Sequence, residues 1–216
     1  MSALSASGGG EAPSGPRSRK GIKTRARLLE AAKEIFEENG FLDARISDIS
    51  ERAGLSHGSF YHYFDSKEEI FREVAAVVDE ELSAPVSSII LDPSSSATPR
   101  ERIRDAMRLH FESYRKEARI LGVIEQVARY DEHVSAMRSA RHKEDREQVA
   151  SSIRQLQRHG LADRSLDPMI AAAGLGAMTW RFAEMWFVER QLDCSFDEGV
   201  EQITALFVNA LKLKDK

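Results

Sequence analysis

Apolar residues recur every three or four positions along most of the chain, which is the period of an amphipathic α-helix. Alternating patterns typical of β-strands are scarce. Glycines, prolines and capping residues divide the helical pattern into about nine segments. The expected helices are one from Thr24 to Gly40, one around 46–53, one after Ser56, one between Ser66 and Pro85, and those at 101–117, 120–130, 131–159, 168–191 and 197–212, with a loop over 85–99. The sequence therefore predicts an all-α fold.

Residues 41–67 contain two short helices with clear boundary signals. Gly54 separates the two helices, and Ser56 is a suitable N-cap for the second of them. Ser66 and Glu69 then have the capping-box spacing that opens the next helix. Two short helices joined by a glycine turn and followed by a longer helix are typical of a helix-turn-helix.

The second short helix has two different faces. At the helical period, Phe60 and Phe64 point inward, whereas Gly58, Ser59 and His62 point outward. A small, polar face can approach base edges in the major groove, where serine and histidine donate or accept hydrogen bonds. Glycine at position 58 costs roughly 0.5–1 kcal/mol of helix stability relative to alanine. Its lack of a side chain lets the helix come close to DNA.

This segment resembles the DNA-binding domain of the TetR family of bacterial transcriptional regulators. The residues that carry the resemblance are Gly40-Phe41, Ile46, Ile49, Ala53-Gly54, Leu55-Ser56, Gly58-Ser59-Phe60-Tyr61, Tyr63-Phe64 and Ser66-Lys67-Glu68. The match covers about residues 22–70, and the remainder agrees only in the number and order of its helices. The resemblance implies an N-terminal three-helix DNA-binding domain followed by a larger helical domain that binds a ligand and dimerises.

The resemblance also implies roles for individual residues. Base contacts are expected from Ser47, His57, Gly58, Ser59, Tyr61 and His62, and phosphate contacts from Tyr63 and Lys67. Arg45 stands where the family commonly has a hydroxyl cap, and we expect it to reach a phosphate. Two alternatives stay open. Tyr61 lies near the boundary of the core face, and exposed histidines are common on helices that bind nothing.

The N-terminal region changes composition abruptly. Residues 1–16 are rich in serine, glycine, alanine and proline, which favours disorder. Six basic residues and no acidic one then lie between Arg17 and Arg27. This run is either a solvated tail or an arm that contacts phosphates. We expect a disordered tail over residues 1–20, a helix-turn-helix domain over 21–66 and an effector-binding and dimerisation domain over 67–216.

Stripes of methionine and aromatic residues in the C-terminal part predict a ligand pocket. Methionine adapts to irregular apolar shapes, and apolar cavities with few polar groups bind small molecules. The residues expected to line the pocket are Met107, Phe111, Tyr114, Val123, Val127, Met178, Phe182 and Met185. The alternative is that these stripes form an ordinary core. Their composition favours an apolar or amphipathic effector.

The last two helices favour a homodimer. Small residues between Ala171 and Ala177 permit close approach of another helix. The apolar residues of the last helix are Val200, Ile203, Phe207 and Leu211. The resemblance implies that these two helices form the dimer interface, and the alternative is that they close the core of the monomer. Two-fold symmetry would match a near-palindromic operator.

Composition excludes several other classes. The formal net charge of −4 excludes a uniformly basic protein but allows a local basic patch. The single Cys194 excludes an internal disulfide framework and a multi-cysteine metal site, and favours a cytoplasmic location. The longest uncharged apolar stretch, Met169–Trp180, is too short to span a bilayer, so no membrane partner is expected.

No enzyme signature accompanies the helical pattern. The spacings H-E-x-x-H, G-x-S-x-G and the P-loop are absent from the sequence, so we expect no catalytic residues, metal or cofactor. The sequence thus predicts a ligand-responsive regulator of operator DNA, a repressor rather than an activator. The alternative is a helical protein that binds lipids or acyl thioesters and has lost its operator function.

Overall fold

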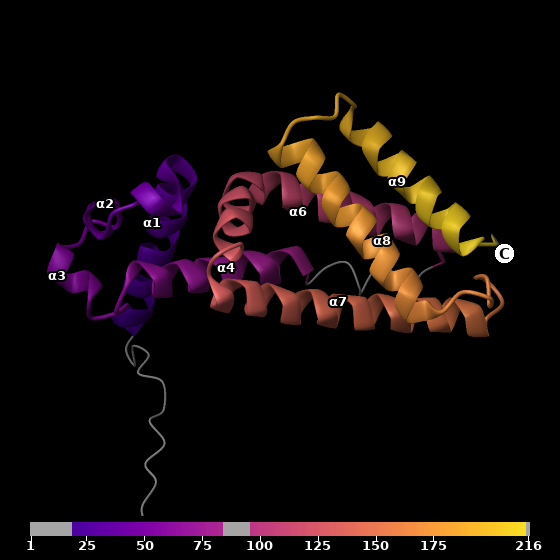
Figure 1. The fold of residues 1–216 in the computed structure, drawn as a ribbon, viewed down its shortest axis with the longest axis horizontal. Helices are drawn as coiled ribbons and strands as arrows, with labels where there is room; N and C mark the ends of the chain where they lie inside the picture. The colour runs from indigo at the N-terminus through magenta and orange to yellow at the C-terminus, as the bar shows by residue number, and fades with distance from the viewer. Residues whose placement is uncertain (1–18, 84–95, 215–216) are drawn as a thin grey trace, which may run out of the picture.

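The computed structural model describes residues 19–83 and 96–214. Within them it contains eight α-helices and one π-helical turn, which confirms the predicted all-α fold. Three helices gather at one end of an elongated molecule, a fourth leads away from them, and four more form a larger body (Figure 1). In that order they are α1 (Arg19–Asp43), α2 (Ile46–Arg52), α3 (His57–Phe60), α4 (Lys67–Ser83), α6 (Pro99–Ala128), α7 (Glu132–Arg158), α8 (Pro168–Ala183) and α9 (Phe196–Leu211).

Helix α1 begins earlier than predicted. It starts at Arg19 instead of near Thr24, because the long side chains of the basic run are good helix formers. The last two residues of the predicted tail are therefore helical, and residues 1–18 lie outside the described residues. Gly40 has a φ of +72°, which glycine adopts readily, and it kinks the chain at the predicted place. One more turn follows, to Asp43.

Helices α1, α2 and α3 form the first helical group. The core of this group is a cluster of phenylalanine rings. Phe36 and Phe41 of α1 have ring centroids 5.0 and 4.8 Å from that of Phe71 in α4. Phe60 and Phe64, which the sequence predicted to point inward, are 0% and 1% exposed. Helix α4 therefore completes the core of the group that carries α2 and α3.

A single helix, α6, replaces two predicted ones. The segments at 101–117 and 120–130 are continuous, and the prediction of two helices is wrong. Ala118 and Arg119, which join them, are good helix formers, and no glycine or proline interrupts the chain there. Residues 85–95 of the predicted loop lie outside the described residues.

The last three α-helices begin at side-chain caps. Asp131, Asp167 and Ser195 each accept hydrogen bonds from backbone N–H groups in the first turn of α7, α8 and α9. Helix α8 then changes into a π-helical turn, η1 (Glu184–Val188), so the single α-helix predicted over 168–191 is wrong in its last part. The wider turn re-aims the side chains that follow, and hydrophobic periodicity does not report such a change.

The apolar stripe of α9 faces inward. Val200, Ile203, Phe207 and Leu211 are all below 8% exposed, so they close the monomer's own core, and the prediction that they form an interface is wrong for these residues. Other apolar side chains of the last two helices face outward, among them Ile170 in α8, which is 74% exposed. None of the helices in the described ranges is long and apolar enough to cross a membrane.

Candidate nucleic-acid interface and effector pocket

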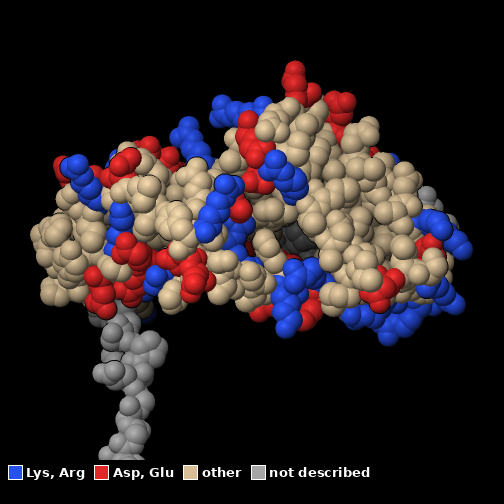
Figure 2. All heavy atoms as spheres, in the orientation of Figure 1, with Lys and Arg blue, Asp and Glu red and all other residues tan. Residues whose placement is uncertain are grey.

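The outward face of α3 is small, polar and uncharged. The Ser56 hydroxyl caps the helix by accepting from the Ser59 amide at 3.3 Å, and it lies 2.7 Å from the Ser59 hydroxyl. His57, Gly58 and His62 are exposed, and a Cβ placed on Gly58 would meet no atom within 4 Å. Figure 2 shows mostly uncharged atoms at the end of the molecule formed by α2 and α3. This is the surface that the sequence predicted for DNA.

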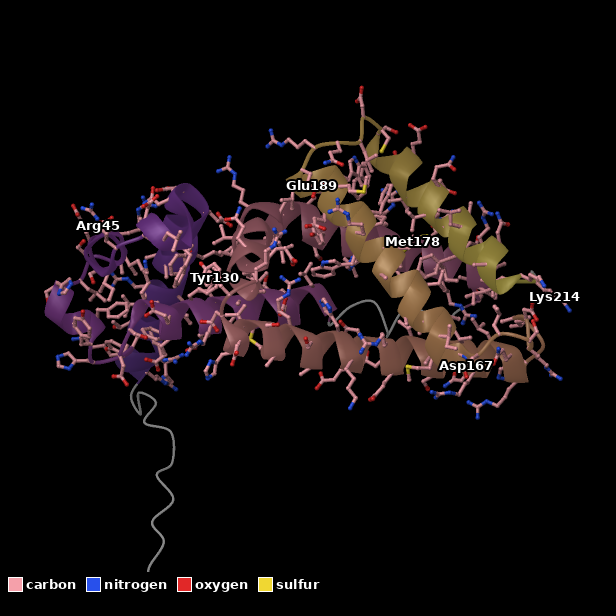
Figure 3. All side chains as sticks on the ribbon, in the orientation of Figure 1. Arg45, Tyr130, Asp167, Met178, Glu189 and Lys214 are labelled. Carbon is pink, nitrogen blue, oxygen red and sulfur yellow. The ribbon has the colours of Figure 1, made fainter. Side chains whose placement is uncertain are left out.

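Arg45, Ser47 and Tyr61 also lie exposed on this helical group. Arg45 is the N-cap of α2, its side chain makes no capping hydrogen bond, and it lies toward the outer end of the molecule (Figure 3). Ser47 donates to Asp48 Oδ1 at 2.9 Å. Tyr61 is 48% exposed, and its ring centroid lies 5.4 Å from that of His57. About half of the Tyr61 side chain is therefore buried, and the other half is open to a partner.

The ammonium group of Lys67 makes hydrogen bonds within the protein. Its ammonium donates to the backbone carbonyls of Phe41, Leu42 and Ala44 at 2.7, 3.1 and 2.9 Å. It also lies 4.7 Å from the centroid of the Phe41 ring. Lys67 therefore closes the end of α1, where the last carbonyls have no helical partner. A phosphate would have to compete with these carbonyls for the ammonium. Tyr63 is half-buried.

The basic run of α1 is divided between side chains that have partners within the protein and side chains that have none. Arg25 pairs with Glu73 of α4 and lies 4.7 Å from the centroid of the Phe64 ring. Arg27 donates to the backbone carbonyl of Ala53. In the described part of the run, the basic side chains without an internal ion pair or hydrogen bond are those of Arg19, Lys20 and Lys23. The charge available to phosphates is therefore smaller than the sequence run suggested.

A buried ion pair joins the two helical groups. Glu117 of α6 is 1% exposed and pairs with Lys33 of α1, while Lys116 lies 3.1 Å from its other oxygen. A buried carboxylate needs such partners because uncompensated burial of a charge is costly. Glu117 was not among the residues that the sequence predicted to have a role. The available signal was a charged residue on the apolar stripe of α6, between Tyr114 and Leu121.

A cavity of about 160 Å³ lies among α6, α8 and η1. Its wall includes two aromatic rings, three carboxylates and one guanidinium, those of Tyr114, Trp180, Glu125, Glu184, Glu189 and Arg129. Tyr114 is the one predicted ligand residue in this wall. Glu189 lies just beyond η1, at the end of the α8 segment that faces α6 (Figure 3). The cavity wall is therefore more polar than the sequence stripes indicated.

The other predicted ligand residues are not part of this wall. They are Met107, Phe111, Val123, Val127, Met178, Phe182 and Met185. Phe111 is fully buried, and its ring centroid lies 5.6 Å from that of Phe182 and 5.7 Å from that of Trp186. Phe111 and its neighbours therefore pack as part of the ordinary core, which was the alternative to a ligand pocket.

Buried polar groups adjoin the cavity wall. Arg138 of α7 is 5% exposed, its Nη1 lies 3.0 Å from Glu125, and its guanidinium lies 5.2 Å from the Trp180 ring centroid. The His142 ring is 4.9 Å from that of Trp180, and burial, followed by Arg138, lowers the pKa of His142. The sequence signal for Arg138 was its place one turn after the buried Val134. In the described ranges no cluster of His, Cys, Asp or Glu is arranged to hold a metal ion.

Comparisons with known proteins agree with this geometry. The family model described as bacterial regulatory proteins, tetR family, matches residues 28–74. The HTH-type regulator YdgC of Bacillus subtilis (strain 168) is 41% identical over 73 residues, which are 34% of this chain and 37% of that protein. UidR, an HTH-type transcriptional regulator of Escherichia coli (strain K12), is 26% identical over 190 residues, 82% of this chain and 89% of UidR.

Solved structures share the fold. SmeT, the repressor of the Stenotrophomonas maltophilia multidrug efflux pump SmeDEF, superposes with a TM-score of 0.67 at 23% identity, over 88% of this chain and 90% of SmeT. The capped helix-turn-helix, its open outward face and these matches define a DNA-binding transcriptional regulator, not an enzyme. Residues 28–74 match the tetR family model, so this part of the chain is the DNA-binding region of a TetR-family transcriptional regulator, as the motif of residues 40–68 predicted.

Proposed function

We propose that this protein is a dimeric repressor that acts in the cytoplasm and binds a near-palindromic operator. A small apolar or amphipathic effector, entering the cavity beside Tyr114, releases it from DNA. The observation that carries the proposal is the open outward face of α3, which is small, polar and uncharged. Such a helix can lie in the major groove with its side chains against base edges.

The proposed DNA contacts are exposed residues, together with the half-buried Ser59 and Tyr63. The proposed contact residues are Arg45, Ser47, His57, Gly58, Ser59, Tyr61, His62 and Tyr63, joined by Arg19, Lys20 and Lys23 of α1. Ser59 and His62 would select bases, because hydroxyl and imidazole groups can donate and accept. The basic side chains would hold phosphates without selecting sequence. Lys67 would act mainly by fixing the end of α1 against α4.

Exposed apolar residues on α8 and α9 support the dimer. Ile170 of α8 is 74% exposed, and Leu206 of α9 is 49% exposed. Gly174 and Ala177 lie one and two turns from Ile170 and are also exposed. Small residues let a partner helix approach closely and cover the larger side chains. A two-fold pair would present two copies of α3 to half-sites on one face of the DNA.

The position of the cavity supports an effector response. Tyr114 lines the cavity, and Glu117, one turn further along α6, pairs with Lys33 of α1. A ligand that shifts α6 would therefore act on the DNA-binding group through a direct contact. Binding at one site changes affinity at another only when the two sites bias a common structural element, and α6 is that element here.

Selection of duplexes from a random DNA pool, followed by titration at several salt concentrations, tests the proposal. We expect a sequence-selective complex of two chains per duplex with a steep salt dependence. The substitution His62→Ala should change which sequence is selected. The matched control His133→Ala alters an exposed histidine of α7 and should leave the selection unchanged. Binding without sequence preference, or by a single chain, would overturn the proposal.

A further inference from the structure

The wall of the cavity combines carboxylates with aromatic rings. Glu125, Glu184 and Glu189 contribute three carboxylates, against the single guanidinium of Arg129. The rings of Tyr114 and Trp180 are the aromatic part of the wall. Aromatic faces and carboxylates both attract cations, and neither attracts an anion. Figure 2 shows acidic and basic side chains gathered on the surface near the end of α8.

Internal ion pairs neutralise only part of this negative charge. Arg138, which is buried, holds Glu125 at 3.0 Å. Glu184 and Glu189 share one partner, Arg181, at 2.6 and 2.8 Å. Two carboxylates on one guanidinium leave one negative charge at the Glu184 and Glu189 pair, and Arg129, which lines the same cavity, offsets it in the total. The Arg181 side chain is 51% exposed, so its ion pairs contribute little and a ligand can displace them easily.

The Tyr114 hydroxyl is a free polar group in the same wall. The residue is 2% exposed, and no hydrogen bond of its hydroxyl is found among the described residues. Burial raises the pKa of Tyr114, and the charge of Glu184 raises it further. The neutral hydroxyl can therefore accept from, or donate to, a ligand in the cavity.

We propose that this cavity binds a small organic cation, an ammonium or amidinium group attached to an apolar ring or chain. The cationic group would lie between Glu184 and Glu189, and the apolar part would lie against Tyr114 and Trp180. The inference deepens the proposed function, since it gives the amphipathic effector a positive charge. It rests on that function only for the consequence that the cation releases DNA.

Isothermal titration calorimetry of the full chain with three probes of one size tests the charge preference. The probes are benzyltrimethylammonium, benzyl alcohol and phenylacetate, which share one ring and differ in charge. We expect the cation to bind at least about tenfold more tightly than the anion, with the neutral probe between them. Equal binding of all three, tighter binding of the anion or neutral probe, or no binding of the cation would overturn the inference.

Two substitutions that change the charge of the cavity wall in opposite directions locate the site. Glu184→Gln should weaken binding of benzyltrimethylammonium, and Glu147→Gln, an exposed glutamate of α7, should not change it. Arg181→Gln should tighten binding, because it frees both carboxylates from their partner. Since Arg181 is exposed, this variant keeps the test decisive even if Glu184→Gln fails to fold. An unchanged affinity in Arg181→Gln would place the cation elsewhere and overturn the assignment.

A DNA titration separates this inference from the proposed function. If the chain binds a selected operator but prefers the anionic probe, the charge assignment fails and the regulator stands. If it binds benzyltrimethylammonium but shows no sequence-selective complex, the cavity assignment stands and the operator function fails. Addition of the cation to the operator complex should weaken DNA binding in the wild type and not in Glu184→Gln. A cation that weakens both complexes equally would act outside this cavity and contradict the assignment.

Discussion

Replacement of Lys67 by methionine separates two roles for this residue. Methionine keeps most of the apolar stem and removes the ammonium, which donates to three carbonyls at 2.7 to 3.1 Å and lies over the Phe41 ring. A hydrogen bond from a charged donor contributes about 1.5–3 kcal/mol. The three bonds share one ammonium, which loses its hydration once, so they do not add. We expect Lys67→Met to lower the free energy of unfolding by about 2–4 kcal/mol.

Urea unfolding followed by circular dichroism measures this loss, and Lys23→Met is the matched control. Lys23 lies exposed on α1 without an internal partner, so its substitution should leave stability unchanged within about 0.5 kcal/mol. Operator titration should give the reverse result. Lys23→Met should flatten the salt slope by about one unit, as expected for a lost phosphate contact, and Lys67→Met should leave the slope unchanged. A stable Lys67→Met protein with a flattened slope would refute the capping role and restore the phosphate role.

Three other positions give separate tests. Gly58→Ala should leave the free protein equally stable or stabilise it by up to about 1 kcal/mol, because the added methyl meets no atom within 4 Å, yet it should weaken operator binding. A thermal melt and a DNA titration measure the two effects, and unchanged operator affinity would contradict the close approach of α3. Lys33→Met leaves the buried Glu117 with Lys116 alone and should cost about 3 kcal/mol in urea unfolding, so a loss below about 1 kcal/mol would show that the pair is dispensable. Burial lowers the pKa of His110 from 6.5 to about 4, so the unfolded chain takes up a proton first, and the wild type loses stability as the pH falls through that window. His110→Gln should lose less stability than the wild type between about pH 7 and about pH 4.5, and equal losses would exclude His110 as the source.

The first helical group was predictable because its signals are local. Ser56 caps the helix that follows it, Gly40 bends the helix that precedes it, and the spacing of Phe60 and Phe64 places both on one face. Each of these signals is read from residues within one or two turns. The family motif adds spacings of the same short range, which is why it located the DNA-facing helix.

Contacts between distant segments were not predictable in the same way. The carbonyls that bind Lys67 lie 23 to 26 residues earlier in the chain, and their position depends on how α1 packs against α4. The stripe of Val200 and Ile203 predicted burial correctly but could not say whether the same chain or a partner covers it.

The residues that line the cavity were also not predictable from local patterns. Tyr114 and Phe111 lie on one stripe of α6, and only the packing of α8 and η1 decides which of them borders the cavity. The readable signals were charged residues at apolar positions, such as Glu117 and Arg138. Periodicity alone treats these as exceptions, although a charge placed there must have a partner in the folded chain.

The phenylalanine cluster limits how such a regulator can be re-engineered by exchange of parts. A chimera that transferred only residues 21–66 to another regulator would separate Phe36 and Phe41 from Phe71, so the junction has to lie beyond that ring. The transplanted segment would also carry Lys33, whose present partner is Glu117. A recipient without an acid at that place would accept the graft poorly. Exchange of operator specificity thus depends on Lys33 and its partner, although we expect neither residue to contact DNA.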